Sequence, residues 1–579
     1  MQIRHLSIRN FRGIRQLDWH IAGEILCLVG PGDSTKTTIL DSIECALNPY
    51  WNLTFSDTDF YNADTSNEII IEVSVSGIPE ALLKDDKFGL YLRGYKEESG
   101  IYDDPDDSCI PILTIQLKVL DDLEPNWYVL KSSNPEPKRI SWREREKIGM
   151  SRLGENVNRH FSWSRGSALT KISDNNTSAF SAICLATRSA CQAIDEAPLK
   201  DLTSSAQSVQ KKAAEFGVKI HSLRPGLDSK ALSQSPGTIS LHDNKTPLRS
   251  FGLGTKRLTS LAIQQSGIRS DGIILIDEIE HGLEPHRIRQ LIKILSDEKM
   301  KVKKREGDTD EDKGQAFFTT HSPTPIMALP VTALGFVNSN DGISTISKVS
   351  SESLSSLQSI VRTKSHALLA RKIIVCEGKT EEALCRVLDE RWASSHDDQN
   401  FAYHGVVAID GQGRNSGPSC ALDLKRIGYD VLFFGDSDRP IKPDETELKT
   451  AGIETVLWPD GMSTEERIAS DLPTPDLIEF LSAAANEYDE TSILDAVSER
   501  LGKKITQFGT DIRIWKKSGI DEAEIRAAIG KTAKTHLNGW FKDLNRGEIL
   551  AKIVTDSLNQ IPDKSLNQTI KKIENWIHE

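Results

Sequence analysis

The spacing of apolar and polar positions in the first fifty residues predicts two strands, a loop and a helix. The opening segment alternates, with Ile3, Leu6 and Ile8 apolar among polar neighbours, as in a strand with one buried face. Residues 25–29 are a continuous apolar run, which is typical of a strand buried on both faces. Helical spacing over 39–47 then ends before a proline. The order is therefore strand, loop, helix.

The loop between this strand and helix has the composition of a phosphate-binding loop. Its sequence is Gly30-Pro31-Gly32-Asp33-Ser34-Thr35-Lys36-Thr37-Thr38. In such a loop the backbone N–H groups hold the phosphates of ATP, the lysine reaches the β- and γ-phosphates, and the next hydroxyl, here Thr37, binds Mg²⁺. We expect Gly30, Gly32, Lys36, Thr37 and Thr38 to form this site. An ordinary strand-to-helix turn is the alternative.

One position in the loop departs from the usual pattern. Thr35 stands where such loops have glycine directly before the lysine. A β-branched residue has much less backbone freedom than glycine. We therefore expect slow ATP hydrolysis, with ATP regulating the protein more than driving it.

Three later segments are expected to complete the nucleotide site. The apolar run 272–276 predicts a buried strand ending in Asp277, a candidate Mg²⁺ ligand, and Glu278, which would orient or deprotonate the attacking water. A glycine-rich turn with Gly252 and Gly254 precedes a helical pattern and is a second candidate phosphate contact. His321 follows another strand, 316–320, where it could face the γ-phosphate. A structural role is the alternative for this histidine.

The second half of the chain repeats strand and helix patterns, with acids where strands end. Apolar runs at 372–376, 406–410 and 431–434 alternate with helical stretches, which predicts a small, mostly parallel sheet. The acids after the first and third runs are Glu377, Glu381, Asp436 and Asp438. Ligands of parallel sheets gather at the carboxyl ends of the strands. Clustered carboxylates repel one another, and Mg²⁺ or Mn²⁺ would relieve that repulsion. Charge compensation by Lys379 or Arg439 is the alternative.

Two other regions have weaker patterns. Residues 179–214 have helical spacing interrupted by Pro198, and could form a dimerisation arm or pack into a core. Residues 460–579 are predicted to be helical, and the polar segment 307–314 a surface loop.

Composition limits the classes of protein. With 579 residues the chain is expected to form two to four domains, and no long apolar run predicts a membrane span or signal peptide, so we expect a cytoplasmic protein. The eight cysteines have no metal-type grouping.

A net charge of −13 disfavours DNA binding by bulk charge, so DNA contacts must be local. Two basic stretches could supply these contacts, and the alternative for each is an ordinary solvated surface. The first stretch contains Lys138, Arg139, Arg143, Arg145 and Lys147. The second contains Lys301, Lys303, Lys304 and Arg305.

The first-half motifs, with Arg9-Asn10-Phe11-Arg12-Gly13 at the start, resemble the ABC-type ATPases of the SMC, RecF and OLD (overcoming lysogenization defect) group. The resemblance covers the N-terminal segment and about residues 250–325. It implies that two ATPase domains sandwich ATP, with the turn from Gly252 completing the site of a second subunit, so a homo-oligomer is implied, either a dimer or a tetramer built from dimers.

The second-half pattern, Glu-Gly-x-x-Glu followed by Asp-x-Asp, resembles the TOPRIM domain of OLD nucleases, topoisomerases and primases over about residues 370–440. By this resemblance Glu377, Glu381, Asp436 and Asp438 bind one or two metals, with Glu377, Asp436 and Asp438 catalytic. OLD nucleases also use a lysine from the C-terminal region. Lys542 is the nearest candidate, with Lys534 and Lys517 as alternatives.

Together these resemblances imply an α/β protein of the OLD family. Residues 1–365 would be an ABC-type P-loop ATPase domain with a helical dimerisation insert at about 180–245, and 366–579 a TOPRIM nuclease domain with a helical extension. The expected activity is metal-dependent endonuclease cleavage of DNA in antiphage defence, with ATP and Mg²⁺ or Mn²⁺ as cofactors. A helicase, or a retron reverse transcriptase with its DNA, is an expected partner.

Two other functions remain open. One is an SMC- or RecF-like DNA-binding repair ATPase with a non-catalytic TOPRIM module, although no sustained heptads appear. The other is a topoisomerase or primase.

Overall fold

The chain is described from a computed structural model. The described residues are 1–49, 53–97, 100–103, 109–154, 177–215, 240–267, 272–300, 314–395 and 400–579, with the isolated positions 158, 161, 162, 169, 222, 224 and 225. They divide into two compact units. Unit 1 comprises 1–11, 20–25 and 39–318, and unit 2 comprises 12–19, 26–38 and 319–579.

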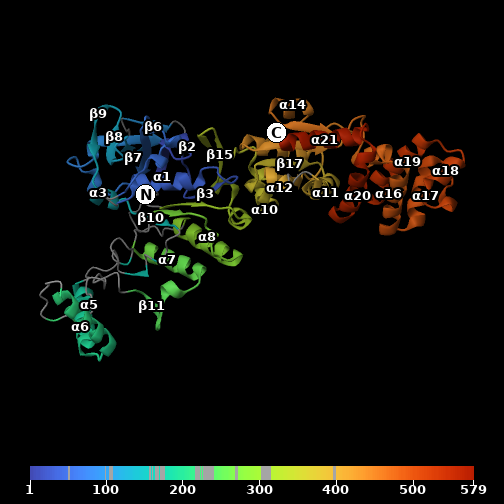
Figure 1. Cartoon of the computed structure of the whole chain (residues 1–579). Helices are drawn as coiled ribbons and strands as arrows, with labels where there is room; N and C mark the ends of the chain where they lie inside the picture. Colours follow the sequence, from blue (N-terminus) through green and yellow to red (C-terminus); the bar gives the residue numbers. More distant parts are fainter. Residues whose placement is uncertain are drawn as a thin grey trace. The chain divides into compact units, whose positions relative to one another are not determined.

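Unit 1 contains an antiparallel group of strands from a large mixed sheet of 14 strands (Figure 1). The long strand β1 (Gln2–Phe11) pairs with β4 (Ile69–Ser76), which pairs with β7 (Ile110–Val119). The others are β5 (Arg93–Lys96), β6 (Gly100–Tyr102), β8 (Pro125–Lys131) and β9 (Asn134–Arg139). Of these only β1 was predicted, because no functional motif marks the residues that follow.

Three parallel strands form the second group of unit 1. Here β13 (Ile273–Ile276) lies between β10 (Met150–Leu153) and β14 (Gln315–Thr319). Both predicted apolar runs are fully buried strands, as expected for a parallel arrangement covered on both faces. The other elements of unit 1 are α1 from Ile39 onward (whole helix Lys36–Leu47), α2 (Glu80–Leu83), α3 (Trp142–Glu146), α7 (Leu253–Gly267), α8 (Pro285–Met300), β11 (His242–Asp243) and β12 (Thr246–Pro247).

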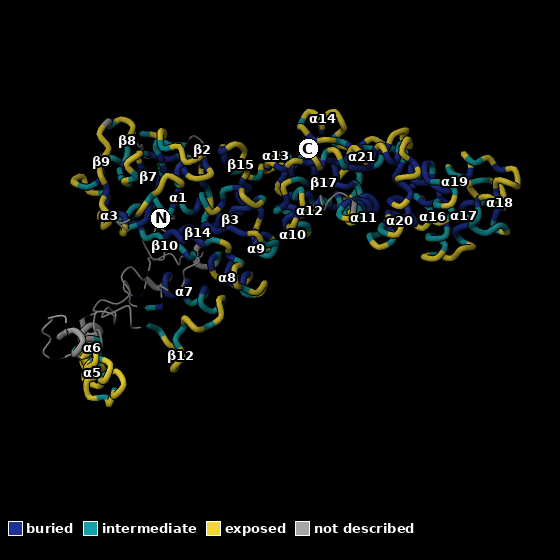
Figure 2. Tube along the Cα trace, in the orientation of Figure 1, coloured by how far each residue is buried: buried dark blue, intermediate teal, exposed yellow. Residues whose placement is uncertain are grey.

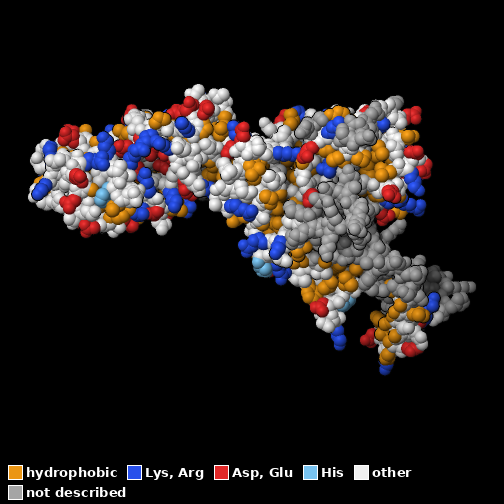
Figure 3. Space-filling view, turned by 180° about the vertical axis from the view of Figure 1, so that it is seen from behind, with side chains coloured by type: hydrophobic (Ala, Val, Ile, Leu, Met, Phe, Trp, Pro, Cys, Tyr) orange, Lys and Arg blue, Asp and Glu red, His pale blue; other side chains and the backbone are white. Residues whose placement is uncertain are grey.

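Two further helices of unit 1, α5 (Thr177–Glu196) and α6 (Lys200–Glu215), confirm the predicted helical segment and its interruption at Pro198. No residue whose burial is described in either helix is buried (Figure 2). Leu202 and Val209 are more than half exposed. Figure 3 shows hydrophobic side chains gathered on the visible face of this hairpin.

In unit 2 the phosphate-loop strand has the predicted position and bounds. β3 (Ile25–Val29) pairs in parallel with β15 (Leu334–Asn340), which pairs with β16 (Ile343–Ser347), and β16 contacts β2 (Ile14–His20). Helices α9 (Pro323–Ala328) and α10 (Leu354–Thr363) follow in the chain.

The predicted small parallel sheet is confirmed in unit 2. Four parallel strands have the order β18 (Val406–Asp410), β17 (Lys372–Cys376), β19 (Asp430–Gly435) and β20 (Glu454–Leu457). The intervening helices are α11 (Lys379–Ser395), α12 (Phe401–His404), α13 (Ser416–Arg426) and α14 (Glu445–Thr450). The edge strand β20 was not predicted, because a run of four residues carries little periodicity.

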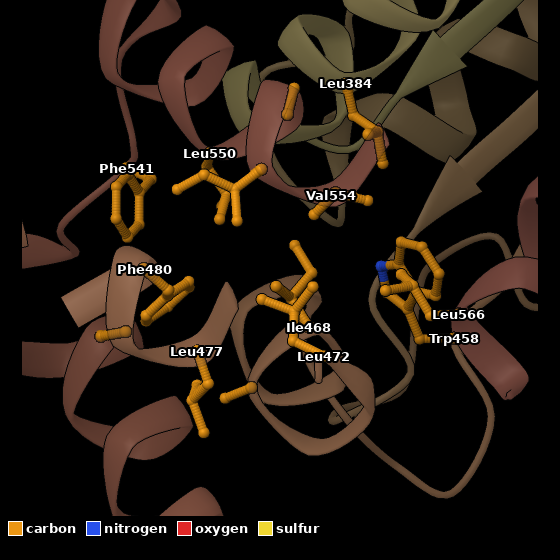
Figure 4. Close-up of a cluster of buried hydrophobic side chains, with 14 of the residues drawn as sticks. Leu384, Trp458, Ile468, Leu472, Leu477, Phe480, Phe541, Leu550, Val554 and Leu566 are labelled. Carbon is orange, nitrogen blue, oxygen red and sulfur yellow. The ribbon is translucent and has the colours of Figure 1, made fainter. Parts of the chain in front are cut away.

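Residues after β20 are helical, as predicted. The helices are α15 (Thr464–Asp471), α16 (Thr474–Glu487), α17 (Glu490–Leu501), α18 (Ile512–Lys517), α19 (Glu522–Thr535), α20 (Leu544–Ser557) and α21 (Ser565–His578). Their apolar faces share one core with the parallel sheet, in which Ile468, Leu550 and Val554 lie close to Leu384 and Trp458 (Figure 4). This shared core fixes the helices against the sheet.

Two glycines allow close helix packing in this core. A Cβ at Gly547 of α20 would lie 2.7 Å from the Cβ of Ala383 in α11. A Cβ at Gly530 of α19 would lie 2.7 Å from the Cα of Glu466 in α15. Any larger residue would separate these helices.

None of the helices in the described part of the chain has both the length and the apolar composition needed to cross a bilayer.

Candidate functional site

The predicted phosphate loop in unit 2 curls around its lysine. Lys36 is only 3% exposed, and its Nζ donates to the carbonyl oxygens of Gly30 (3.1 Å) and Pro31 (2.6 Å) and to Ser34 Oγ (3.0 Å). Ser34 in turn donates to the Pro31 oxygen. The ammonium is therefore enclosed by loop oxygens, which the phosphate oxygens of a nucleotide could replace.

The two loop glycines do not have equal roles. A Cβ on Gly30 would lie 2.5 Å from the carbonyl oxygen of Val337, so only glycine allows β15 to approach the loop so closely. Gly32 has open space around it. At the start of α1, Thr37 is exposed and Thr38 is half-buried.

Thr35 has a left-handed backbone, with φ of 63°, and the neighbouring Asp33 has φ of 60°. A β-branched residue rarely adopts this conformation, which is the one that glycine at this position would supply without strain. The Thr35 hydroxyl donates to the Ser34 carbonyl oxygen (2.7 Å) and lies 3.0 Å from Ser344 Oγ. Threonine in place of the usual glycine therefore leaves the loop backbone strained at Thr35, and the Thr35 hydroxyl holds the loop in this conformation through Ser34 and Ser344.

In unit 1, Asp277, the first of the two acids after β13, lies within an ion-pair network. Arg152 of β10 donates from Nη2 to Asp277 Oδ2 at 3.1 Å and from Nη1 to Glu44 Oε2 at 3.1 Å, and it also pairs with Asp41. Asp41 and Glu44 belong to α1, the helix that follows the phosphate loop. Arg152 therefore connects that helix to the predicted Mg²⁺ ligand. Sequence reasoning missed it, because a single arginine in an unpredicted strand has no pattern.

The glycine-rich turn is fixed to the same acid pair. α7 begins at Leu253, between exposed Gly252 and buried Gly254. Four residues into α7, Arg257 is 2% exposed and donates to the carbonyl oxygens of Asp277 (2.8 Å) and Glu278 (3.1 Å). Two predicted elements of the nucleotide site are thus held together within unit 1.

Glu278 and His321 are both exposed. Glu278 has φ of 46°, and its carboxylate lies 4.0 Å from His281 Nδ1. His321 directly follows Thr320, after β14, in unit 2.

The predicted carboxylates come together in unit 2 at the carboxyl ends of β17 and β19. Glu377 Oε2 accepts from the backbone N of Asp436 at 2.9 Å, and Glu381 Oε2 accepts from Gly378 N at 2.9 Å. A Cβ on Gly435 would lie 2.8 Å from Glu377 Oε2, so glycine makes room for this side chain. Three of the four predicted acids thus lie around one strand-to-helix turn.

Helix α15 reaches the same acids through one residue that sequence reasoning missed. The backbone N of Thr464 donates to Asp436 Oδ1 at 2.8 Å, and its hydroxyl contacts both Asp436 Oδ1 (3.0 Å) and Glu381 Oε1. Trp458 Nε1 donates to the same hydroxyl at 2.6 Å. The helical segment is therefore part of the site.

The environment disfavours full ionisation of these acids. Burial, and then the neighbouring acids Glu465 and Glu377, raise the pKa of Glu381 to about 7, although its hydrogen bond from Thr464 lowers it. Burial and nearby carboxylates also raise the pKa of Asp436 well above its usual range. The pKa of Glu377 is raised by burial and by Asp438, against the lowering effects of the Asp436 amide and Lys542.

The three candidate lysines differ in position. Lys534 Nζ lies 2.5 Å from Asp438 Oδ2 and 3.4 Å from Glu466 Oε2. Burial lowers the pKa of Lys534, but these carboxylates outweigh it and raise that pKa. Lys542 is exposed and packs over Gly539, and its positive charge lowers the pKa of Glu377. Lys517 is exposed at the end of α18, beside Asp511.

The donor type fits a divalent cation, because hard cations prefer carboxylate oxygens. Burial is the first cause of the raised pKa values of Glu377, Glu381 and Asp436, and neighbouring carboxylates add to it. One carboxylate oxygen, Glu465 Oε1, is buried and has no hydrogen-bond partner among the described residues. Of the two alternative cations, Arg439 Nε lies 3.6 Å from Asp438 Oδ2 and so offsets part of the charge of that acid, whereas Lys379 is exposed.

Only part of the predicted basic surface is available for DNA. Arg145 is 2% exposed, donates to the Asn48 carbonyl oxygen, and lies 3.8 Å from the Trp127 ring centroid, so it is a core residue and cannot bind DNA. Lys138 donates to the Asp86 carbonyl oxygen. The second stretch, 301–305, lies outside the described residues, as does the predicted loop 307–314 except for Gly314. Figure 3 shows Lys and Arg interspersed with Asp and Glu over the C-terminal part of the chain.

Comparison with solved structures finds SMC head domains. An SMC head bound to the C-terminal winged-helix domain of ScpA is 14% identical, with 61% of this chain and 99% of that chain covered and a TM-score of 0.31. The SMC head domain from Thermotoga maritima is 12% identical, with 60% and 100% covered and a TM-score of 0.28. A Pyrococcus furiosus SMC head domain with an extended coiled coil, bound to the C-terminal domain of ScpA, is 11% identical, with 62% and 99% covered and a TM-score of 0.32.

No curated protein matches the chain. Residues 25–325 match the family described as "AAA domain, putative AbiEii toxin, Type IV TA system", which is more than half of the chain and spans the phosphate loop, the glycine-rich turn and the acid pair. The chain therefore belongs to this family, and its first half is an ATPase domain of the AAA type.

Proposed function

We propose that the chain is an OLD-family nuclease that binds ATP in its first half and hydrolyses DNA phosphodiester bonds at the carboxylate cluster, in a TOPRIM domain within residues 366–579. The observation that carries this proposal is the convergence of Glu377, Glu381 and Asp436 at the carboxyl ends of two parallel strands. Such a cluster is unfavourable without a cation, and carboxylate-bound cations serve phosphodiester hydrolysis.

Each residue of the cluster has a distinct task in this proposal. Glu377, Glu381, Asp436 and Asp438 would hold one or two Mg²⁺ or Mn²⁺ ions. When bound, such ions supply charge stabilisation for the attacking water and the leaving oxygen. Lys542, exposed beside Glu377, would contact the scissile phosphate and offset its developing negative charge.

For the nucleotide, Lys36 and the loop amides would bind the phosphates of ATP. Thr37 and Asp277 would hold its Mg²⁺, and Glu278 would orient the hydrolytic water. The strain at Thr35 supports slow turnover, so that nucleotide binding gates the nuclease. Gly252 and Gly254 would face the ATP of a second subunit, and His321 its own γ-phosphate.

We further propose a dimer, or a tetramer built from dimers, joined in part through the helical insert at about 180–245. The exposed apolar residues of α5 and α6 support this role, because a second copy would cover them. We also propose a role in antiphage defence. A helicase or a retron reverse transcriptase with its DNA would be the partner.

A plasmid assay tests the nuclease. Supercoiled DNA is incubated with Mg²⁺ or Mn²⁺, with and without ATP, using wild type, Asp436→Asn and Lys36→Ala. We expect metal-dependent nicks or breaks that Asp436→Asn abolishes, and cleavage whose ATP dependence is lost in Lys36→Ala. Glu445→Gln, an exposed acid of the same unit, is the matched control and should cleave like wild type.

Two outcomes would replace the nuclease proposal. DNA binding without cleavage by wild type would favour an SMC- or RecF-like repair ATPase whose TOPRIM module is non-catalytic. Loss of supercoils without nicks would favour a topoisomerase.

A further inference from the structure

Two histidines lie opposite each other on the first two strands of the chain. β1 and β2 are neighbours in the large sheet and are joined by a two-residue turn, so they run antiparallel. The backbone N of Ile21, directly after β2, donates to the Arg4 carbonyl oxygen at 2.8 Å. This bond sets the next pair along, His5 and His20, opposite each other. Their ring centroids lie 4.7 Å apart, with the ring planes tilted by 45°.

Strand alternation brings an acid to the same face of β2. Successive side chains of a strand point to opposite faces, so Asp18 lies on the same face as His20, two residues later. One ligand atom of each residue lies within 4.8 Å of the other two: an imidazole nitrogen of His5, an imidazole nitrogen of His20 and a carboxylate oxygen of Asp18. Three metal-ligand groups of two chemical types therefore meet at this hairpin.

The hydrophobic core does not account for these side chains. Leu17 and Trp19 alternate with them along β2 and are at most 3% exposed, whereas Asp18 and His20 are exposed. His5 is 9% exposed. One face of β2 is therefore apolar and packed, and the other presents the ligand-type groups.

Local structure orients both imidazoles. The pairing of β1 with β4 shifts register between Ile3 and His5, and such a β-bulge changes the direction in which a side chain points. The ring of Tyr95, a residue of β5, stacks on His20 with 6.4 Å between centroids and 23° between planes. A Cβ on Gly100 would lie 3.3 Å from His20 Cε1, so glycine lets β6 lie close to this imidazole.

We propose that His5, Asp18 and His20 bind a divalent transition-metal ion, with Zn²⁺ as the expected occupant. Imidazole nitrogen suits Zn²⁺, Cu²⁺ and Ni²⁺, whereas Mg²⁺ and Ca²⁺ prefer oxygen ligands. Two histidines and one carboxylate are a known ligand set for Zn²⁺, and three protein ligands leave a fourth position for water. The site shares no residue with the nucleotide site or the carboxylate cluster, so it does not depend on the proposed nuclease.

The ligand atoms need only a small approach to coordinate the ion. Bonds of about 2.0–2.2 Å to one zinc ion place tetrahedral ligand atoms about 3.4 Å apart. The three atoms here lie within 4.8 Å of one another. Rotation of the exposed side chains of Asp18 and His20 can supply the difference, of about 1.4 Å or less.

A bound ion would fasten β1 to β2. His5 belongs to β1, whereas Asp18 and His20 belong to β2. The unfolded chain does not hold these three groups together, so the ion binds the folded state preferentially. Zn²⁺ should therefore raise the melting temperature of the chain.

Titration calorimetry with Zn²⁺ on the full chain tests the proposal, in a buffer with excess Mg²⁺ to occupy sites built from oxygen alone. We expect wild type to bind Zn²⁺ and to melt at a higher temperature with it. His20→Ala should lower Zn²⁺ affinity at least about a hundredfold and abolish the rise in melting temperature, because even indirect partners of ligands contribute about 10- to 100-fold. Asp18→Asn, which keeps the shape of the side chain, should lower the affinity at least about tenfold.

His242→Ala is the matched control, because it removes an exposed histidine from another strand of unit 1, β11. It should bind Zn²⁺ like wild type. Since Asp18 and His20 are exposed, both variants should melt like wild type without Zn²⁺, which separates lost binding from lost folding. Absence of Zn²⁺ binding by wild type, wild-type affinity in His20→Ala, or an equal loss in all three variants would overturn the site. Wild-type affinity in Asp18→Asn alone would overturn the carboxylate as a ligand.

Discussion

Single side chains decide how each half of the molecule would work. In the phosphate loop, Thr35 adopts a backbone conformation suited to glycine. In the carboxylate cluster, Lys534 already neutralises Asp438, whereas Lys542 is exposed. Each of these placements leads to a measurable expectation.

Replacing Thr35 by glycine should raise ATP turnover about tenfold, which corresponds to about 1.4 kcal/mol of barrier. Glycine removes the strain and the hydroxyl contact to Ser344, so the loop amides can adjust around the phosphates. The rate of steady-state phosphate release measures this ATP turnover. Asp33→Gly relaxes a similar backbone conformation at an exposed position and is the control. Fast turnover in wild type, unchanged by Thr35→Gly, would show that the loop is not limiting.

Lys542 and Lys534, the two lysines near the carboxylate cluster, should have different functions. Lys542→Ala should lower DNA cleavage about a hundredfold or more while leaving Mn²⁺ affinity unchanged, because this ammonium acts on the phosphate. Lys534→Ala should tighten Mn²⁺ binding, because its ammonium competes for Asp438. Lys517→Ala should change neither property. If only Lys534→Ala abolished cleavage, Lys534 would be the catalytic lysine.

The carboxylate cluster also predicts a pH dependence for the cation-free protein. An unfolded glutamate titrates near 4.5, whereas the pKa of Glu381 is raised to about 7 by burial and by its neighbours. Between these values the folded state binds the extra proton, so the free energy of unfolding falls as pH rises through this window. Urea denaturation in EDTA at pH 5 and pH 8 measures it. Glu381→Gln should flatten the dependence, and an unchanged slope in this variant would exclude Glu381 as its source.

At the scale of elements, side chains from neighbouring strands and helices join the motifs. Arg152 of β10 connects α1 to the end of β13, and Arg257 of α7 holds the turn after β13. In unit 2, Gly530 lets α19 approach α15, which positions Lys534 one helical turn later. The sites therefore depend on packing between elements as much as on the motifs themselves.

Loss of Arg152 should be strongly destabilising. Arg152→Ala would leave Asp41, Glu44 and Asp277 together without their shared cation, at a cost of about 3 kcal/mol. Chemical denaturation measures the free energy of unfolding. Arg15→Ala removes an exposed pair with Asp341 at 3.9 Å and should cost less than about 1 kcal/mol. Equal effects from the two variants would show that the network contributes little.

For the whole molecule, assembly is the property left to test. If the α5–α6 hairpin joins two copies, Leu202→Glu with Val209→Glu should shift the protein toward monomers, because charges on an apolar contact oppose association. Light scattering after size-exclusion chromatography measures this. Leu90→Glu, at a leucine 68% exposed elsewhere in unit 1, should leave the mass unchanged. An unaltered mass in the double variant would exclude the hairpin as the contact.

The sequence by itself determined the strands on which both sites are built and the chemistry at their ends. Long apolar runs such as 25–29 and 372–376 became buried strands, because burial on both faces leaves an unmistakable pattern. The glycines, lysine and acids that follow them were identifiable because their spacing along the chain is local.

Only the tertiary structure decided which distant residues join those motifs. Arg152 and Thr464 carry no local pattern, and Lys534 could not be separated from Lys542 by sequence. Lys534 of α19 reaches Glu466 of α15 because Gly530 permits these two helices to pack closely, and Arg152 reaches Asp277 because β10 pairs beside β13. Pairing and packing of this kind depend on contacts between segments far apart in the chain, and no spacing along the sequence records them.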